Sequence, residues 1–232
     1  MARHGKRYNE AVKQVDSKRH YKIGEAVELI KKLPKTKFDE TLELAFKLGI
    51  DPKQSDQMVR GTVALPHGSG KKVNVVVFAK GAAAQAAKDA GADFVGFEDL
   101  VKKCQEGWTD FDVAVATPEA MQEVRKLGKV LGPRGLMPNP KTGTVAEDTA
   151  KAVKEVKAGR VEFKMDKAAN LHVSLGKVSF AGEAIAENAK AVINAVVHAK
   201  PATAKGQFIE SCTLSSTMGP GIRIDHHEFS VS

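Results

Sequence analysis

The sequence predicts two domains: an antiparallel α+β domain built from both ends of the chain, and a doubly wound parallel α/β domain inserted into it. Three observations lead to this fold class. Buried strands alternate with helices through the middle of the 232-residue chain, strands of alternating polarity occupy both flanks, and turn-forming residues mark the two crossings between them. A chain of this length can bury one large core or two small ones, and the two different patterns favour two.

The inserted α/β domain is expected over residues 68–159. Its first strand, VNVVVFA at 73–79, is a nearly continuous apolar run, which is typical of a strand buried on both faces. Gly91 would stop the helix that follows, and Thr117-Pro118 would cap and start a later one. The expected elements alternate, with strands at 73–79, 94–97 and 111–116 and helices at 82–90, 98–105, from 118 onward, and 146–157. Repetition of this kind predicts a small parallel sheet.

The α+β domain is expected to combine residues 1–67 with residues 160–232. Its first strand, TLELAFKL at 41–48, alternates apolar and polar residues as a half-buried strand should. Further strands are expected at 59–65, 160–165, 171–175 and 208–214. A helix over 182–199 would carry an apolar stripe formed by Ile185, Ala189, Val192, Ile193 and Val196.

The two crossings between the domains are short and rich in small or turn-forming residues. They read PHGSG at 66–70 and AGR at 158–160. Because the chain would cross twice at one place, we expect a hinge and not a loose tether.

Charge is concentrated in the flanks. The composition is that of an ordinary globular protein, with 42% hydrophobic and 28% charged residues, yet the net charge is +8 and the pI about 9.4. Residues 1–37 alone carry +7 (11 − 4), and the two flanks together carry +6 (22 − 16) against +2 (14 − 12) for residues 68–159. A basic arm is either a solvated face or a set of phosphate contacts, and the flank-built domain is the better candidate to bind a polyanion such as nucleic acid.

Cysteine usage and hydropathy indicate the compartment. Cys104 and Cys212 lie far apart and in no Cys-x-x-Cys spacing, which argues against a disulfide framework or a zinc site and fits a reducing cytosol. The N-terminus is basic without an apolar run behind it, so no signal peptide is expected. No segment approaches the roughly 20 apolar residues of a membrane helix, so no membrane partner is expected.

Catalytic, metal and cofactor motifs fail when they are tested individually. GSGKK at 68–72 resembles the end of a phosphate-binding loop, but it precedes a strand and Lys72 stands where a Ser or Thr should hold magnesium. The parallel sheet carries no Gly-x-Gly-x-x-Gly turn. His226-His227 could be a metal pair, although an idle tail is the simpler interpretation. The sequence therefore predicts no catalytic residue, metal site or cofactor.

The segment 129–145, KVLGPRGLMPNPKTGTV, is the most unusual part of the chain. Its prolines and glycines predict neither helix nor strand. Arg134 and Lys141 within it suggest an anionic partner, and the alternative is a basic surface connector.

The C-terminal strand should carry a row of hydroxyls. Ser211, Thr213 and Ser215 alternate, so they would share one face, and Thr217-Met218-Gly219 would close the row in a tight turn. Such hydroxyls suit ribose 2′-OH and phosphate groups, and the alternative is an ordinary solvated strand face. Lys37-Phe38 pairs a cation with a ring that could lie on a ribose or base, or in the core.

Three segments taken together resemble the bacterial ribosomal protein uL1 family. They are LGPRGLMPNPKTGTV at 131–145, SDQMVRGTVALPHG at 55–68 and STMGPG at 216–221, and the resemblance covers essentially the full chain. It implies a discontinuous α+β domain with an inserted Rossmann-like domain, in a structural protein of the large ribosomal subunit that is not an enzyme.

The same resemblance implies partners and a site. The partners would be the 23S rRNA stalk beside the exit site, the exit-site tRNA whose release it would assist, its own operon mRNA, which it would repress, and other large-subunit components, in a cytoplasmic protein that is monomeric off the ribosome. The implied RNA-binding residues are Lys37, Phe38, Thr41, Asp166, Lys167, Ser211, Thr217, Met218 and Gly219.

Two other functions stay open on the sequence. A sugar-phosphate or nucleotide-handling enzyme on the α/β domain would need a phosphate cradle or an acid–base pair, and the sequence offers neither. A general basic RNA chaperone would be indifferent to the shape of its RNA.

Overall fold

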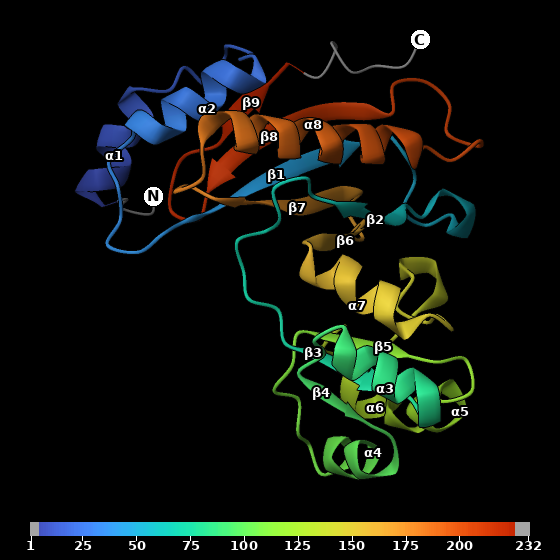
Figure 1. Cartoon of the computed structure of the whole chain (residues 1–232). Helices are drawn as coiled ribbons and strands as arrows, with labels where there is room; N and C mark the ends of the chain where they lie inside the picture. The colour runs from blue at the N-terminus through green and yellow to red at the C-terminus, as the bar shows by residue number, and fades with distance from the viewer. Residues whose placement is uncertain (1–4, 226–232) are drawn as a thin grey trace. The chain divides into compact units, whose positions relative to one another are not determined.

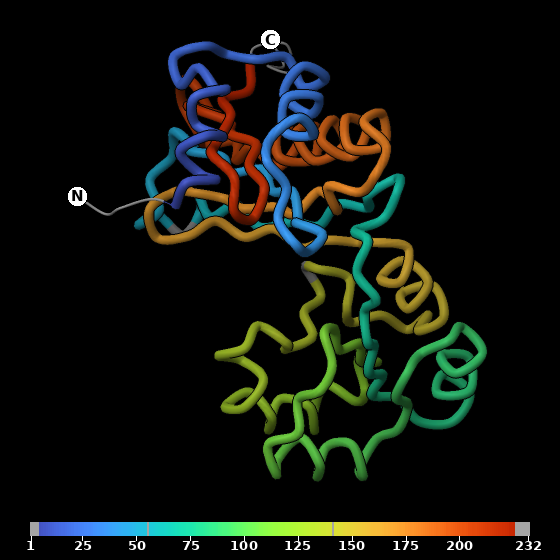
Figure 2. Tube along the Cα trace, turned by 90° about the vertical axis from the view of Figure 1, so that its left-hand side faces the viewer, coloured from blue at the N-terminus to red at the C-terminus, as the bar shows by residue number. Residues whose placement is uncertain are grey.

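The computed structural model describes residues 5–225, and in it the chain forms two compact units (Figure 1). One unit consists of Met1–Gly70 with Val161–Ser232, and the other of Lys71–Arg160. We call them the flank-built unit and the inserted unit. Figure 2 shows the blue N-terminal segments interleaved with the orange and red C-terminal segments in the flank-built unit, while green and yellow segments make up the inserted one.

The flank-built unit is organised around a four-stranded sheet with the strand order β7-β1-β8-β9. β1 pairs antiparallel with β7 and with β8, and β8 pairs antiparallel with β9. The strands are β1 Thr41–Leu48, β7 Asn170–Lys177, β8 Ile209–Ser216 and β9 Ile222–Ile224. The sequence did not predict β9, which has three residues and lies at the edge of the sheet.

Helices cover one face of this sheet. α8, Gly182–His198, follows the expected helix, and all five residues of its predicted stripe are at most 1% exposed. They pack with α2, Ile23–Lys32, against the buried residues of β1 in one apolar core. Because β1 alternates strictly, its other four side chains lie on the opposite face, which is polar. α1, Lys6–Lys13, completes the helices of this unit.

A smaller two-stranded sheet joins β2, Arg60–Ala64, to β6, Arg160–Lys164. Gly61 faces the buried ring of Phe163, and a Cβ at position 61 would lie 2.6 Å from Phe163 Cζ. Close packing therefore requires glycine at that position.

A β-bulge changes which side chains of β7 reach the polar face. Leu42 pairs with Gly176 and Glu43 with Ser174, so β7 has one extra residue at this point. Gly176 has φ 137°, which glycine tolerates. The bulge shifts the alternation, and Lys177 pairs with Thr41.

The inserted unit contains a three-stranded parallel sheet with the order β4-β3-β5, and the predicted fold class is confirmed. Val76 and Phe78 of the central strand join one core cluster, while Val75 and Val77 join another, so β3 is buried on both faces. The elements are β3 Val75–Phe78, α3 Gly81–Asp89, β4 Phe94–Gly96, α4 Glu98–Gln105, β5 Val113–Ala116, α5 Met121–Val124, α6 Gly128–Leu131 and α7 Thr149–Lys157.

Two predicted helices of this unit begin later than expected. Thr117 Oγ1 does accept a hydrogen bond from the Ala120 N–H at 3.3 Å, but the helix starts at Met121 and is divided by a 3₁₀ turn before α6. α7 begins at Thr149 and not at 146, because Val145 pairs with Ala116 and the Ala146 N–H donates to the Ala116 carbonyl at 3.2 Å. The Asp148 side chain caps α7 by accepting from the Lys151 N–H at 3.0 Å.

The expectation that 129–145 forms neither helix nor strand is wrong in part. Its first three residues end α6, Pro140–Thr142 form a 3₁₀ turn, and Val145 makes a β-bridge. Leu136 and Met137 pack against the core, and Asn139 N donates to Thr144 Oγ1 at 2.8 Å. Proline and glycine exclude long helices here, but the packing of Leu136 and Met137 and the hydrogen bond to Thr144 still give the segment a defined structure.

The first crossing, 66–70, is attached to the flank-built unit. The fully buried Asn188 side chain accepts from the His67 N–H at 3.1 Å and donates to the carbonyls of Gly68 at 3.1 Å and Leu175 at 2.8 Å. These bonds explain why the contacts place the division after residue 70, where the sequence placed it after 67.

Candidate nucleic-acid interface

The open face of the four-stranded sheet presents a polar surface that runs the length of β1. Lys47, Ala45 and Glu43 of β1 pair with Ser211, Thr213 and Ser215 of β8. The intervening Cys212 and Leu214 are buried, so the predicted hydroxyl row does share one face. We call this surface, with the turns at its two ends, the polar face.

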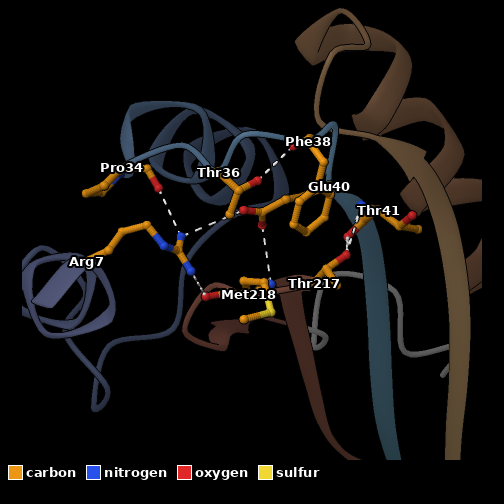
Figure 3. Close-up of polar contacts among 8 residues, drawn as sticks. All are labelled: Arg7, Pro34, Thr36, Phe38, Glu40, Thr41, Thr217 and Met218. Carbon is orange, nitrogen blue, oxygen red and sulfur yellow. Dashed lines mark hydrogen bonds and ion pairs between the residues drawn. The ribbon is translucent and has the colours of Figure 1, made fainter. Parts of the chain in front are cut away.

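At one end of the polar face, Thr41 and Thr217 are joined by reciprocal hydrogen bonds (Figure 3). Thr217 Oγ1 accepts from the Thr41 N–H at 3.0 Å and lies 3.2 Å from the Thr41 carbonyl, to which it can donate. The Thr217 N–H also donates to that carbonyl at 3.1 Å. Lys177 Nζ donates to Thr41 Oγ1 at 2.9 Å, so the bulge brings a cation to this end.

The turn after β8 holds Met218 outward. The Met218 side chain is 52% exposed, while its carbonyl accepts from Arg7 Nη2 at 2.7 Å. The Gly219 N–H donates to the Ser216 carbonyl at 3.1 Å, and a Cβ at position 219 would lie 2.4 Å from Ser216 Oγ. The turn is therefore tight, and its apolar tip points into solvent.

Phe38 is a second exposed apolar group at this end, and 55% of it is accessible. The Phe38 carbonyl accepts from Thr36 Oγ1 at 2.7 Å, which holds the segment before β1 in place. Lys37 beside it is also exposed. Core packing, the alternative for Phe38, is excluded.

Arg7 and Glu40 tie this end to α1. Arg7 Nη1 donates to the Pro34 carbonyl at 3.1 Å and lies 3.7 Å from the Glu40 carboxylate, which is buried. Figure 3 shows the two side chains between the Thr36–Phe38 segment and the Met218 turn. Neither was predicted as part of the site, because the alignment of α1 against this turn is set by tertiary packing.

At the other end, Asp166 shapes a tight turn between β6 and β7. Its carboxylate accepts from the N–H groups of Asn170 at 2.7 Å and Ala168 at 2.8 Å. These backbone hydrogen bonds, that from Asn170 first, lower the pKa of Asp166 below its ordinary value. Lys167 at the tip is exposed, and Lys47 Nζ donates to the Ala168 carbonyl at 2.6 Å.

The nine predicted residues therefore form two groups. Thr41 and Lys47 are at opposite ends of β1, which at about 3.3 Å per residue are roughly 20 Å apart. The structure brings together Lys37, Phe38, Thr41, Thr217, Met218 and Gly219 at one end and Asp166, Lys167 and Ser211 at the other.

The charges on and beside the polar face are mixed but mainly positive. Lys47, Lys177 and Arg223 join the predicted Lys37 and Lys167. Glu43 of β1 adds a negative charge to this face, and its carboxylate lies 3.5 Å from His172 Nδ1. The alternation of β1 would have been enough to place Lys47 on this face from the sequence. The position of Lys177 could not be predicted in this way, because it depends on the bulge in β7.

The inserted unit has a cavity of about 340 Å³ at the carboxyl ends of its strands. Nucleotides bind at this position in doubly wound sheets. However, its cation Lys80 already lies 4.0 Å from the centre of the Phe97 ring and 3.6 Å from Glu98. Its lining also includes Glu119 and Glu147, which would repel phosphate.

Residues 5–225 provide neither a metal site nor a membrane-spanning helix. No group of three or more His, Cys, Asp or Glu side chains that could hold a metal ion occurs there, and no helix in that range is long and apolar enough to cross a membrane. Both cysteines are buried, and burial raises the pKa of Cys212 to about 12. The suggested pair His226-His227 lies outside the described residues.

Residues 30–220 match the family described as the ribosomal protein L1p/L10e family. Two relatives, each called large ribosomal subunit protein uL1, come from two strains of Lactobacillus delbrueckii subsp. bulgaricus, ATCC BAA-365 / Lb-18 and ATCC 11842. Each is 55% identical over 225 residues, which cover 97% of this chain and 97% of the relative. The similarity extends across both units.

Proposed function

The chain belongs to the ribosomal protein L1p/L10e family and is a structural protein of the large ribosomal subunit, and from this premise we propose that it binds the stalk region of 23S rRNA through the polar face. The proposal rests mainly on the structure of one end of the polar face, which is formed by Thr41, Thr217 and Met218. It combines bonded hydroxyls, an exposed methionine and a tight turn in which close packing against Ser216 favours glycine at position 219.

The proposed recognition depends on the shape of the RNA. Lysines at both ends of the polar face, roughly 20 Å apart, would contact phosphates on separate parts of a folded RNA. The hydroxyl row would meet ribose 2′-OH groups, and Phe38 and Met218 would lie against ribose or base surfaces. An irregular helix or junction can satisfy both ends at once, whereas an unrelated duplex cannot place the same groups in register.

A regulatory role rests on the same surface. We propose that an operon mRNA with a similar fold competes with rRNA for the polar face, so that excess free, monomeric protein represses its own synthesis in the cytoplasm. We also propose that the protein assists the release of deacylated tRNA from the exit site.

Replacing Thr217 by Val tests the site. The change keeps the shape but removes the hydroxyl that bonds Thr41, so affinity for a stalk RNA fragment should fall by about 1–3 kcal/mol with little change in salt dependence. Thr109→Val, which removes a hydroxyl that accepts a hydrogen bond from Arg134 in the inserted unit, is the matched control. If Thr217→Val binds the fragment as tightly as the parent does, the site assignment is wrong.

A comparison of RNAs tests the function itself. At fixed salt, the parent should bind the stalk fragment at least tenfold more tightly than a duplex of equal length. Equal affinity for the two would indicate a general RNA chaperone and refute the proposal.

A further inference from the structure

A cavity of about 310 Å³ opens beside the Phe38 and Gly219 end of the polar face. It lies at the lower end of the range of small-ligand sites, roughly 300–1000 Å³. Ile30, Leu33 and Val178 provide apolar lining, and Phe38 is part of its wall. An apolar interior beside an exposed aromatic ring suits a flat, uncharged ring system.

The charges that line the cavity balance. Arg7 and Lys35 are cationic, and Asp39 and Glu40 are anionic. Asp39 is already engaged, because it accepts from Ser179 Oγ at 2.7 Å and from the Ser179 N–H at 3.2 Å. Arg7 also donates through Nη1 and Nη2 to the carbonyls of Pro34 and Met218. Lys35 is exposed, so a free phosphate would gain only a solvent-screened contact here.

Glu40 is a buried polar group of this lining with unused hydrogen-bonding capacity. The residue is 6% exposed, and within residues 5–225 its carboxylate meets only the Arg7 guanidinium at 3.7 Å and the Met218 N–H at 3.4 Å (Figure 3). A carboxylate can accept about four hydrogen bonds, and both of these contacts are long. A buried acceptor this poorly satisfied favours a ligand that brings N–H donors.

The identity of the ligand follows from the donors that each base presents. Guanine has adjacent N1–H and N2–H₂ donors on one edge, which match the two oxygens of a carboxylate. Adenine and cytosine place an acceptor beside their amino group, and uracil flanks its N–H with two carbonyls, so each would put an oxygen or nitrogen lone pair against Glu40.

We propose that this cavity receives one unstacked guanine base of the bound RNA, with Glu40 accepting from N1–H and N2–H₂ and Phe38 covering a face of the ring. The inference rests on the proposed RNA binding and adds one base-specific contact to it. Arg7 is a positioning residue, which holds the Met218 turn and the Pro34 segment around the cavity.

The test replaces each unpaired guanosine of a stalk RNA fragment singly by inosine, which lacks only the N2 amino group. We expect one position at which inosine weakens binding to the parent protein on the order of tenfold, the loss expected for a hydrogen bond to a charged acceptor. If every inosine RNA binds like the parent RNA while the fragment is still preferred over a duplex, the guanine site is refuted and the RNA-binding function stands.

The Glu40→Gln variant distinguishes a direct contact between Glu40 and guanine from a role of Glu40 in supporting the Met218 turn. A glutamine offers one acceptor and one donor, so guanosine and inosine RNAs should bind this variant nearly equally, and adenosine at the same position should be tolerated better than by the parent. A variant that loses affinity for all RNAs by the same factor, with its inosine penalty unchanged, would show that Glu40 only supports the turn and would overturn the proposal.

Competition with guanosine monophosphate tests whether the cavity binds a guanine of the RNA or a free nucleotide. The free nucleotide should compete weakly and only when the sensitive guanosine is present in the RNA. Tight binding of the nucleotide to the protein, lost in Glu40→Gln and without any inosine-sensitive position, would assign the cavity to a free nucleotide and refute the RNA contact.

Discussion

The salt dependence of RNA binding should follow the lysines of the polar face and not the total charge of the chain. The perturbation is a triple variant, Lys37→Gln, Lys47→Gln and Lys167→Gln, which removes cations from both ends of the face. Each phosphate contact contributes about 0.7 to 0.9 to the slope of log K against log salt. Three lost contacts should therefore flatten the slope by roughly 2.1 to 2.7 units.

The magnitude is large enough to measure by filter binding or fluorescence anisotropy. Between 50 and 200 mM salt, the salt concentration rises fourfold, so the difference in affinity between parent and variant should shrink by roughly 20- to 40-fold. The control is Lys88→Gln, Lys102→Gln and Lys154→Gln, three exposed lysines of the inserted unit. Both triple variants lower the net charge equally. If the control flattens the slope as much as the test variant, long-range charge and not local contact governs binding, and the reasoning is refuted.

Three further predictions concern stability and reactivity. Gly61→Ala should lower the free energy of unfolding by about 1–3 kcal/mol in urea, because the new Cβ would strike the buried Phe163 ring, and an unchanged midpoint would contradict this packing. The lowered pKa of Asp166 means that its carboxylate contributes stability that is present above the ordinary value of 3.8 and lost as the pH falls through the lowered value. Asp166→Asn should therefore flatten the acid limb of a plot of stability against pH, and an unaltered limb would contradict a pKa lowered by folding. Cys212, buried with a pKa raised to about 12, should resist thiol reagents at pH 8 until the protein unfolds, and rapid labelling of the native protein would contradict its burial.

Much of the fold could be predicted from the sequence because each element is encoded locally. Thr41–Leu48 was predicted with its observed bounds, since alternating polarity marks a strand with one buried face. The stripe of α8 was predicted residue by residue for the same reason, with a period of 3.6 in place of 2. α7 was misplaced at its start because pairing of Val145 with Ala116, a tertiary contact, competes with helix formation.

The site was predictable only in part. The hydroxyl row follows from strand periodicity, and the turn at Thr217-Met218-Gly219 from its small residues, whereas Asp166 and Lys167 came from the resemblance to a family. The sequence could not indicate that the Asp166 carboxylate would accept hydrogen bonds from backbone N–H groups of its own turn. Nor could it show that the predicted residues separate into two ends of one strand.

The sequence by itself determined the two kinds of sheet, the basic flanks and the family, because periodicity, composition and motifs are properties of the chain read in order. Tertiary structure alone decided which distant groups meet. A one-residue bulge brings Lys177 to Thr41, and the packing of α1 leaves the Glu40 carboxylate buried beside a cavity. Register and helix docking are settled by the burial of whole apolar faces, so no local pattern specifies these contacts.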